Sequence, residues 1–243
     1  MKDNHVVNTT SLLTETPLPT PHSLLPIKIK ICGLFREQDI DYVNEARPDY
    51  VGFVFAESKR RVSPAFAAGL RNRLSDEIIP VGVFVNAPVA DIAALYNDNV
   101  IAIAQLHGME DDEYITQLKE ASAVDGNKPV EVIKTVKSAE LEKNTPIAAG
   151  ADYYLIDSGA GSGKAFNWEL LNSAKMNALK GTKPWFLAGG VDIGNIEQAL
   201  GYNPYALDVS SGAETDGIKD RAKIVQLVSI VRGYAARKGN NHE

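Results

Sequence analysis

The sequence contains very little cysteine: Cys32 is the only one among 243 residues. A single cysteine cannot form a disulfide within the chain, and neither paired cysteines nor an HExxH motif supplies the spacing of a metal site. No run approaches 18 apolar residues, which argues against a membrane-spanning helix. We therefore expect a protein of the reducing cytoplasm that does not contact a membrane.

Positive charge is also scarce. Lys and Arg together number 25 against 31 Asp and Glu, which gives a net charge of −6. Nucleic-acid binding needs a basic face, so we expect no nucleic-acid partner. A small anionic ligand remains compatible with this charge, because a few local donors can hold a phosphate in an acidic protein.

The beginning of the chain differs in composition from the rest. Residues 1–26 are rich in Thr, Ser, Asn and Pro, and they lack the basic start and apolar block of a signal peptide. Such a composition favours a flexible segment that does not join a core. We predict a flexible N-terminal tail over 1–26, one catalytic domain over 27–237 and a C-terminal tail over 238–243.

From residue 27 onward one pattern repeats: a short β-branched or aromatic run, a polar loop, and a stretch with helical apolar spacing. Eight such units predict a single-domain α/β fold, a (β/α)8 TIM barrel. A doubly wound open sheet is the alternative, but its first turn would normally carry several glycines, and only Gly33 is present. The predicted strands are Ile27–Ile31, Tyr50–Phe55, Pro80–Phe84, Ile101–Leu106, Val130–Thr135, Asp152–Ile156, Trp185–Ala188 and Ala206–Val209, and the later predicted helices include 139–149, 168–179, 193–200 and 220–237.

Polar residues follow almost every predicted strand. In a barrel the catalytic face lies at the C-terminal ends of the strands and in the loops after them. Each residue has an ordinary explanation, since glycines make turns and charges after strands are often solvated. Their joint placement on one rim is harder to explain by chance. The rim candidates are Cys32, Arg60, His107, Asp157 and Asp208.

Glycine clusters come late in the chain, after the sixth, seventh and eighth predicted strands. Glycine lets backbone N–H groups approach an anion closely, and the last loops of a barrel are its usual phosphate site. The run at 161–164 is not a nucleotide P-loop, because Ser158 stands where that motif needs a glycine. We predict a phosphorylated small-molecule ligand held by Gly161, Ser162, Gly163, Gly189, Gly190, Ser211 and Gly212.

Two of the rim candidates can transfer protons. Cys32 closes the first predicted strand, and an ionised thiol is a usable base. Asp157 closes the sixth, where an apolar mouth would raise the pKa of a carboxylic acid and let it donate a proton. From the residues alone, Cys32 can equally be a buried apolar filler and Asp157 a loop-ordering carboxylate.

Several motifs together resemble the phosphoribosylanthranilate isomerase family of tryptophan biosynthesis. The resemblance runs from Ile27 to about Arg232, and its first and fifth motifs are together the most specific. The matching stretches are KICG at 30–33, VGFVFAESKRRVSP at 51–64, VGVFVN at 81–86, QLHG at 105–108, LIDSGAGSGKAFNW at 155–168, LAGGV at 187–191 and LDVSSGAETDGIKD at 207–220.

This resemblance implies a cofactor-free, metal-free barrel that performs an Amadori rearrangement of N-(5-phosphoribosyl)anthranilate. Cys32 would be the general base and Asp157 the general acid. Arg60 would hold the anthranilate carboxylate, while His107 and Asp208 would line the site and the glycine loops would grip the phosphate. Arg60, rather than its neighbour Arg61, is assigned this role by the motif alone. The resemblance leaves open whether the protein is a monomer or a homodimer.

The chain departs from the family pattern in two places. Leu34 and Phe35 follow Gly33, where family members usually have Ile and Thr, so a hydroxyl is lost and an aromatic ring gained. The loop between Asp157 and Gly161 is also short. Two rival functions remain: a related barrel enzyme, such as a phosphosugar epimerase, a histidine-pathway isomerase or a tryptophan-pathway lyase, and a non-catalytic phosphate-binding barrel. Neither rival needs the pair Cys32 and Asp157.

Overall fold

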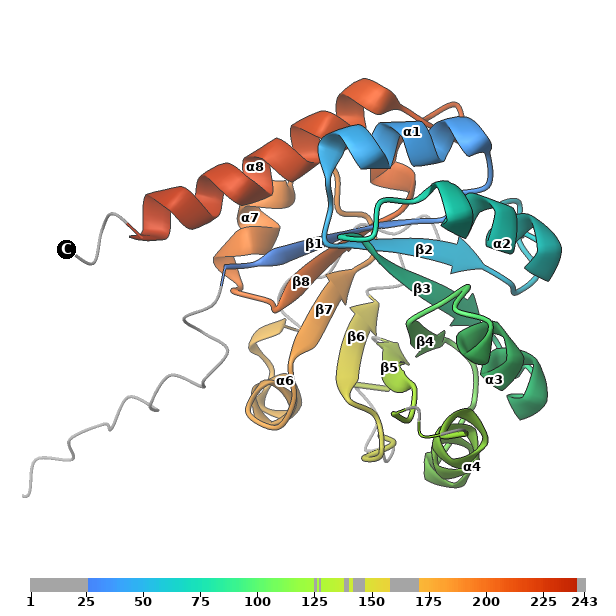
Figure 1. Cartoon of the computed structure of the whole chain (residues 1–243). Helices are drawn as coiled ribbons and strands as arrows, with labels where there is room; N and C mark the ends of the chain where they lie inside the picture. The colour runs from blue at the N-terminus through green and yellow to red at the C-terminus, as the bar shows by residue number, and fades with distance from the viewer. Residues whose placement is uncertain are drawn as a thin grey trace, which may run out of the picture.

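The computed structural model describes residues 26–124, 126, 128–137, 140–141, 147–157 and 171–239. Its eight parallel strands form a closed barrel in which β1 pairs with both β2 and β8 (Figure 1). This closure confirms the predicted TIM barrel and excludes the open sheet. The strands are β1 Lys28–Cys32, β2 Tyr50–Val54, β3 Ile79–Phe84, β4 Ile103–Leu106, β5 Glu131–Lys137, β6 Tyr153–Asp157, β7 Trp185–Ala188 and β8 Ala206–Val209.

Helices surround the barrel and cover its outer face (Figure 1). Their starts follow local chemistry: the Ser63 and Asp111 side chains accept hydrogen bonds from Phe66 N and Tyr114 N and so cap α2 and α4. The helices are α1 Glu37–Ala46, α2 Pro64–Arg73, α3 Val89–Asn97, α4 Asp112–Ser122, α6 Ala174–Lys180, α7 Ile196–Gly201 and α8 Arg221–Gly239.

The helix predicted over 139–149 was wrong at its C-terminal end. Residues 147 and 148 are not helical, and 142–146 lie outside the described residues. The proline at position 146 of the sequence is a poor residue for a helix interior, because it lacks a backbone donor and clashes with the preceding turn. The sequence pattern of this stretch therefore predicted a helix that extends too far toward the C-terminus.

Strand β1 illustrates how the barrel separates two cores. Its alternating side chains point to opposite faces. Ile29 and Ile31 are fully buried and pack with α1 and α8 residues such as Val43 and Leu227 in the core between barrel and helices. The intervening Lys28, Lys30 and Cys32 therefore face the barrel interior, where a second, smaller cluster includes residues from other strands.

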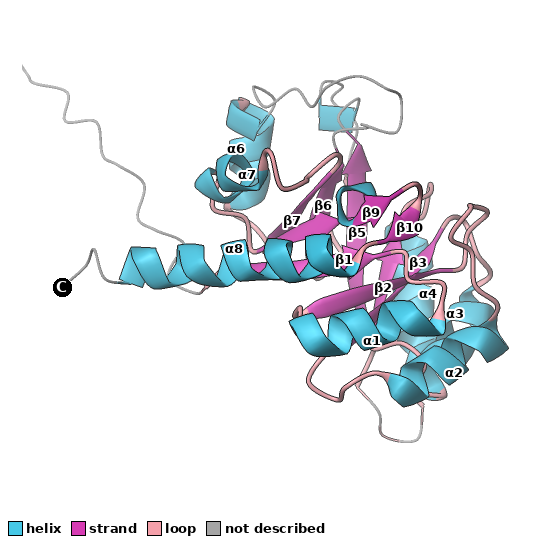
Figure 2. Cartoon of the chain, turned by 90° about the horizontal axis from the view of Figure 1, so that it is seen from above, coloured by secondary structure: helices cyan, strands magenta, loops and turns pink. Residues whose placement is uncertain are grey.

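A short hairpin follows β8 at the C-terminal end of the barrel. It begins with the 3₁₀ helix η4 (Ser211–Ala213) and continues as the antiparallel strands β9 (Glu214–Thr215) and β10 (Ile218–Lys219). Figure 2 shows the hairpin, with its strands labelled β9 and β10. Sequence patterns did not predict this hairpin, because two-residue strands are too short for periodicity to register.

Two sequence predictions concern the chain as a whole. Within the described residues, no helix has both the length and the apolar character needed to cross a membrane. The predicted N-terminal tail lies almost entirely outside those residues, as do positions 240–243 of the C-terminal tail. The division into tails and one catalytic domain therefore stays a prediction.

Candidate active site

Five predicted site residues lie at or just beyond the C-terminal ends of the barrel strands. Cys32 ends β1, Asp157 ends β6 and Asp208 belongs to β8, while His107 follows β4 and Arg60 lies in the loop after β2. In the closed barrel, β6 is reached from β1 by passing β8 and β7. Cys32 and Asp157 therefore stand on different sides of the barrel mouth, as a base and an acid on either side of a ligand would.

The Cys32 thiol lies beside a buried ion pair. Lys30 Nζ is 3.0 Å from both carboxylate oxygens of Asp208, and Lys30 also contacts the Cys32 side chain. Burial alone would lower the pKa of Lys30, but the charges of Asp208 and Cys32 outweigh it and raise that pKa. Lys30 is fully buried and stays a cation next to the thiol.

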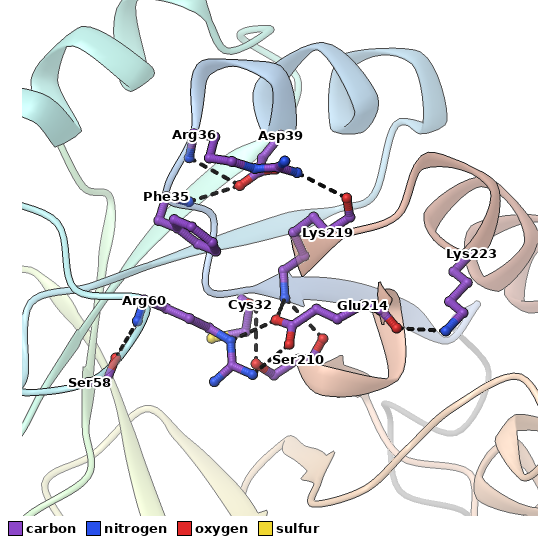
Figure 3. A network of polar contacts seen from close by, with 10 residues as sticks. All are labelled: Cys32, Phe35, Arg36, Asp39, Ser58, Arg60, Ser210, Glu214, Lys219 and Lys223. Atoms are coloured by element: carbon purple, nitrogen blue, oxygen red, sulfur yellow. Dashed lines mark hydrogen bonds and ion pairs between the residues drawn. The ribbon is translucent and has the colours of Figure 1, made fainter. Parts of the chain in front are cut away.

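Arg60 reaches the same thiol from the loop after β2 (Figure 3). Its Nε and Nη2 donate to the two carboxylate oxygens of Glu214 at 2.6 Å each. The side chain crosses over Gly33, where a Cβ would lie only 2.4 Å from Arg60 Cδ, and Gly33 has φ +83°. Any side chain at Gly33 would displace the arginine, which explains the glycine after Cys32.

The positive and negative side chains around Cys32 are unequal in number. Three cations, Lys30, Arg60 and Lys219, face two carboxylates, Asp208 and Glu214. One positive charge is therefore in excess when Cys32 is a neutral thiol, and a thiolate would neutralise it. Burial raises the pKa of Cys32, while Lys30 and Lys219 oppose that effect and Asp208 adds to it. The thiol pKa therefore stays above its ordinary value, although the lysines hold it below the value that burial alone would give.

Asp157 is held from the opposite side of the barrel. Its Oδ2 lies 3.2 Å from His107 Nε2, and the other ring nitrogen of His107 lies 3.2 Å from the Thr135 hydroxyl. The Gln105 amide nitrogen is 3.5 Å from the same ring nitrogen. These contacts fix the orientation of the His107 ring and, through it, the Asp157 carboxyl group.

The glycine loops are only partly described. Gly189 and Gly190 have φ of 94° and 77° after β7, which L side chains rarely adopt. At Gly212 a Cβ would lie 2.0 Å from the Val191 carbonyl oxygen, so η4 packs directly against the loop after β7. These two loops are therefore adjacent, as a shared anion site would require. The predicted phosphate residues Gly161, Ser162 and Gly163 lie outside the described residues.

Sequence reasoning missed four residues that touch this site: Lys30, Glu214, Lys219 and Thr135. Strand alternation could have found Lys30, since it lies two residues before Cys32 and shares its face. Glu214 and Lys219 stand within the last family-like stretch but received no role. The two residues pair across the β9–β10 hairpin, and residue spacing alone does not predict that pairing.

The unusual Leu34 and Phe35 are accommodated by Asp39. Leu34 is fully buried, and the backbone N–H groups of Phe35 and Arg36 both donate to Asp39 Oδ2 at 3.0 and 3.1 Å. Arg36 also pairs with Asp39 and packs over the Phe35 ring. The loop after β1 is therefore ordered by a carboxylate on α1 without a hydroxyl at position 35.

A family model for N-(5'phosphoribosyl)anthranilate (PRA) isomerase matches residues 29–230. The chain belongs to the phosphoribosylanthranilate isomerase family. A phosphoribosylanthranilate isomerase of Endomicrobium trichonymphae is 44% identical over 211 residues, which cover 84% of this chain and 98% of that protein. The family resemblance of the sequence motifs is thereby confirmed.

Solved structures of phosphoribosylanthranilate isomerases have the same fold. Monomeric variants of the dimeric enzyme from Thermotoga maritima match with a TM-score of 0.68 and 29% identity, covering 85% of this chain and 99% of that one. An isomerase in complex with reduced 1-(o-carboxyphenylamino)-1-deoxyribulose 5-phosphate matches with a TM-score of 0.67 and 28% identity, covering 85% and 99%. The barrel and its order of elements are thus those of the family.

Proposed function

We propose that this protein converts N-(5'-phosphoribosyl)anthranilate into 1-(2-carboxyphenylamino)-1-deoxyribulose 5-phosphate in tryptophan biosynthesis. Membership of the isomerase family supports the reaction. The observation that carries the proposal for this chain is the position of its only thiol: Cys32 lies at the barrel mouth beside an excess positive charge, with Asp157 across the barrel. A simple phosphate-binding barrel would have no use for this pair.

The reaction begins with Asp157 in its protonated form. Asp157 donates its proton to the ribose ring oxygen, the bond from C1 to that oxygen breaks, and the nitrogen lone pair forms a protonated Schiff base. The Cys32 thiolate then removes the proton from C2, and the electron pair moves toward the nitrogen to give an enolamine. Tautomerisation to the ketone completes the rearrangement. Both catalytic steps are proton transfers between side chains and substrate, and the proposal assigns no cofactor or metal.

His107 serves this mechanism by orienting Asp157. The His107 ring holds one oxygen of the Asp157 carboxyl group, and Thr135 keeps that ring from rotating. Asp208 is occupied by Lys30, but a carboxylate accepts about four hydrogen bonds. We therefore assign its remaining lone pairs to a substrate hydroxyl. The buried Gln105 Oε1, which has no partner among the described residues, is a further acceptor for such a hydroxyl.

Arg60, rather than Arg61, is assigned to the anthranilate carboxylate. Arg60 turns inward: the Glu214 carboxylate raises its pKa, burial opposes that rise, and Cys32 adds to it. Arg61 instead pairs with Glu57 at 2.9 Å, and both of those side chains are exposed. A guanidinium binds a carboxylate with two parallel N–H donors, which a lysine cannot do.

The phosphate is assigned to the glycine loops at the end of the chain. Gly189, Gly190, Ser211 and Gly212 supply backbone N–H groups from two adjacent loops, and the stretch Gly161–Gly163 would complete the grip. The ligand is thus a phosphorylated small molecule, and we assign the protein to the cytoplasm as a monomer or homodimer. The dimeric Thermotoga maritima relative supports the second state.

The test is an isomerase assay on the purified full chain. Freshly made N-(5'-phosphoribosyl)anthranilate should lose its anthranilate-type fluorescence at an enzyme-dependent rate, and the product should match authentic carboxyphenylamino-deoxyribulose phosphate by mass spectrometry. A chain that binds this substrate without turnover would indicate the phosphate-binding alternative. A chain that turns over only a histidine-pathway or epimerase substrate would contradict the proposal.

A further inference from the structure

The hairpin after β8 carries a buried ion pair that faces the site. Glu214 and Lys219 are directly opposite each other in the antiparallel register, so their side chains share one face. Glu214 is 7% exposed and Lys219 is 2% exposed. Lys219 Nζ donates to Glu214 Oε1 at 2.5 Å and to the Ser210 carbonyl at 2.9 Å. A buried pair of this kind needs further hydrogen bonds to offset desolvation, and here Arg60 supplies them.

Glu214 uses only one edge of the Arg60 guanidinium. Its two oxygens accept from Nε and Nη2, which is the side-on arrangement (Figure 3). A guanidinium carries five N–H donors, so the end formed by Nη1 and Nη2 retains a second pair of parallel donors. Within the described part of the chain, Nη1 makes no hydrogen bond, and the Arg60 side chain is 29% exposed. The unused edge is therefore the part of Arg60 available to a ligand carboxylate.

The hairpin itself is anchored on both strands. Arg36 Nη2 donates to the Lys219 carbonyl at 3.0 Å, and Lys223 Nζ donates to the Glu214 carbonyl at 2.6 Å. Arg36 belongs to the loop after β1 and Lys223 to α8, so two different elements fix the hairpin backbone. The Glu214 carboxylate consequently has a defined position from which it can restrain a long, flexible arginine.

We propose that Glu214 and Lys219 are positioning residues that hold Arg60 side-on, so that its Nη1–Nη2 edge receives the substrate carboxylate end-on. This inference rests on the proposed function, in which Arg60 binds that carboxylate. Lys219 keeps Glu214 in place, and Glu214 removes the rotational freedom of Arg60 before the ligand arrives. Such preorganisation lowers the cost of immobilising a side chain on binding.

The test compares two ligands that differ only in the carboxylate. One is reduced 1-(o-carboxyphenylamino)-1-deoxyribulose 5-phosphate, and the other is its analogue made from aniline. We expect Glu214→Gln to weaken binding of the first ligand by about tenfold, and binding of the aniline analogue by less than about twofold. In turnover, Glu214→Gln should raise KM by a larger factor than it changes kcat. Glu57→Gln is the matched control, because Glu57 pairs with exposed Arg61 on the same loop, and it should change neither affinity.

Lys219 provides a second, independent pair of variants. Lys219→Met should lower the preference for the carboxylate-bearing ligand, whereas Lys219→Arg keeps the charge and should retain the preference. Equal weakening of both ligands by Glu214→Gln and by Lys219→Met would overturn the inference and assign these residues a purely structural role. Unchanged binding in folded variants would overturn it as well.

The wild-type measurements distinguish a failure of this inference from a failure of the proposed function. A wild-type chain that does not prefer the carboxylate-bearing ligand, or does not turn over the substrate, contradicts the proposed function and the inference together. A wild-type chain with both properties, combined with ligand-independent effects of the variants, contradicts the positioning role alone.

Discussion

Two lysines of β1, Lys28 and Lys30, lie in very different parts of the same barrel interior. Lys28 is near the N-terminal end, where its Nζ is 2.8 Å from the Tyr205 hydroxyl and 3.3 Å from that of Tyr50. It also lies over both aromatic rings. Lys30 is two residues further along the strand, on the same face, where it pairs with the Asp208 carboxylate beside Cys32.

The contrast shows how one barrel divides its interior between stability and chemistry. Around Lys28, Tyr50, Tyr153, Phe186 and Tyr205 pack edge to face or tilted against one another and fill the interior with neutral groups. Burial, the Tyr205 hydroxyl and neighbouring charges raise the pKa of Tyr50, so it stays a phenol. Around Lys30 the groups are charged and unbalanced. The N-terminal end is therefore a packed plug, and the C-terminal end gathers charged groups around the thiol.

The strongest test of this division removes the proposed base or acid. Cys32→Ser and Asp157→Asn should each lower kcat by about 10³-fold, because a positioned acid or base contributes roughly 10²–10⁴. The fold and the affinity for inorganic phosphate should remain nearly unchanged, as measured by circular dichroism and by phosphate inhibition. Near-normal turnover by either variant would remove the role given to that residue.

The second prediction exchanges the two lysines for methionine. Lys30→Met should lower kcat/KM by about 10²-fold, because the thiolate loses its adjacent cation. It should also cost about 3 kcal/mol of stability, since Asp208 is left buried without its partner. Lys28→Met should cost about 1 kcal/mol of stability through lost hydrogen-bond and cation–π contacts, with kcat/KM changed less than about threefold.

Urea unfolding and steady-state kinetics on both variants check these values. The double variant Lys30→Met with Asp208→Asn should be more stable than Lys30→Met alone, because no buried charge is left unpaired. If Lys28→Met were as damaging to turnover as Lys30→Met, the division of the interior would be wrong.

Much of the barrel could be predicted from the sequence because each strand and helix carries a local signal. The predicted strands Trp185–Ala188 and Ala206–Val209 have the same bounds as β7 and β8. The first strand was displaced by one residue, since Cys32 pairs with Gly52 and belongs to β1. The sequence pattern over 139–149 is weaker, and the helix predicted there was wrong at its C-terminal end.

The candidate site could be predicted only as a set of strand ends. Spacing placed Cys32 and Asp157 on the rim, because a parallel barrel brings all C-terminal ends together. It could not reveal that Glu214 occupies one edge of Arg60, since those residues are 154 positions apart. Nor could it show that Lys30 and Asp208 neutralise each other, which depends on the closure of the barrel between β1 and β8.

A third prediction compares adjacent arginines on the loop after β2. Arg60→Lys should raise KM by about tenfold, because a lysine cannot keep Glu214 side-on and still offer two parallel donors to a second carboxylate. Arg61→Lys should leave KM within about twofold, as its exposed pair with Glu57 contributes little. Steady-state rates measured over a range of substrate concentrations give the KM of both variants. Equal KM values would contradict the assignment of Arg60.

A fourth prediction concerns the buried ion pair of Glu110 and Lys134, which holds the loop after His107. Glu110 accepts hydrogen bonds from Lys134 Nζ and from the backbone N–H groups of Asn86 and Gly108. Burial would raise the pKa of Glu110, but the hydrogen bonds from Lys134 and from the Asn86 backbone help to outweigh it, and that pKa is lowered. Its contribution to stability is therefore present above the unfolded pKa of about 4.3 and is lost as pH falls through the lower, folded value.

Glu110→Gln should accordingly reduce the free energy of unfolding by about 2 kcal/mol at pH 7, and the difference from wild type should shrink as the pH falls below about 4. Denaturant unfolding at several pH values measures both quantities. A stability difference that is independent of pH would contradict the assigned ionisation.

The central claim is that Lys30, at the C-terminal end of the interior, sets the ionisation of Cys32. Because Cys32 is the only cysteine, its alkylation by iodoacetamide can be followed by mass spectrometry across a pH series in wild type, Lys30→Met and Lys28→Met. The account predicts a midpoint at least about one pH unit higher in Lys30→Met, because an adjacent cation favours the thiolate, and a wild-type midpoint in Lys28→Met. Identical midpoints in wild type and folded Lys30→Met would contradict it.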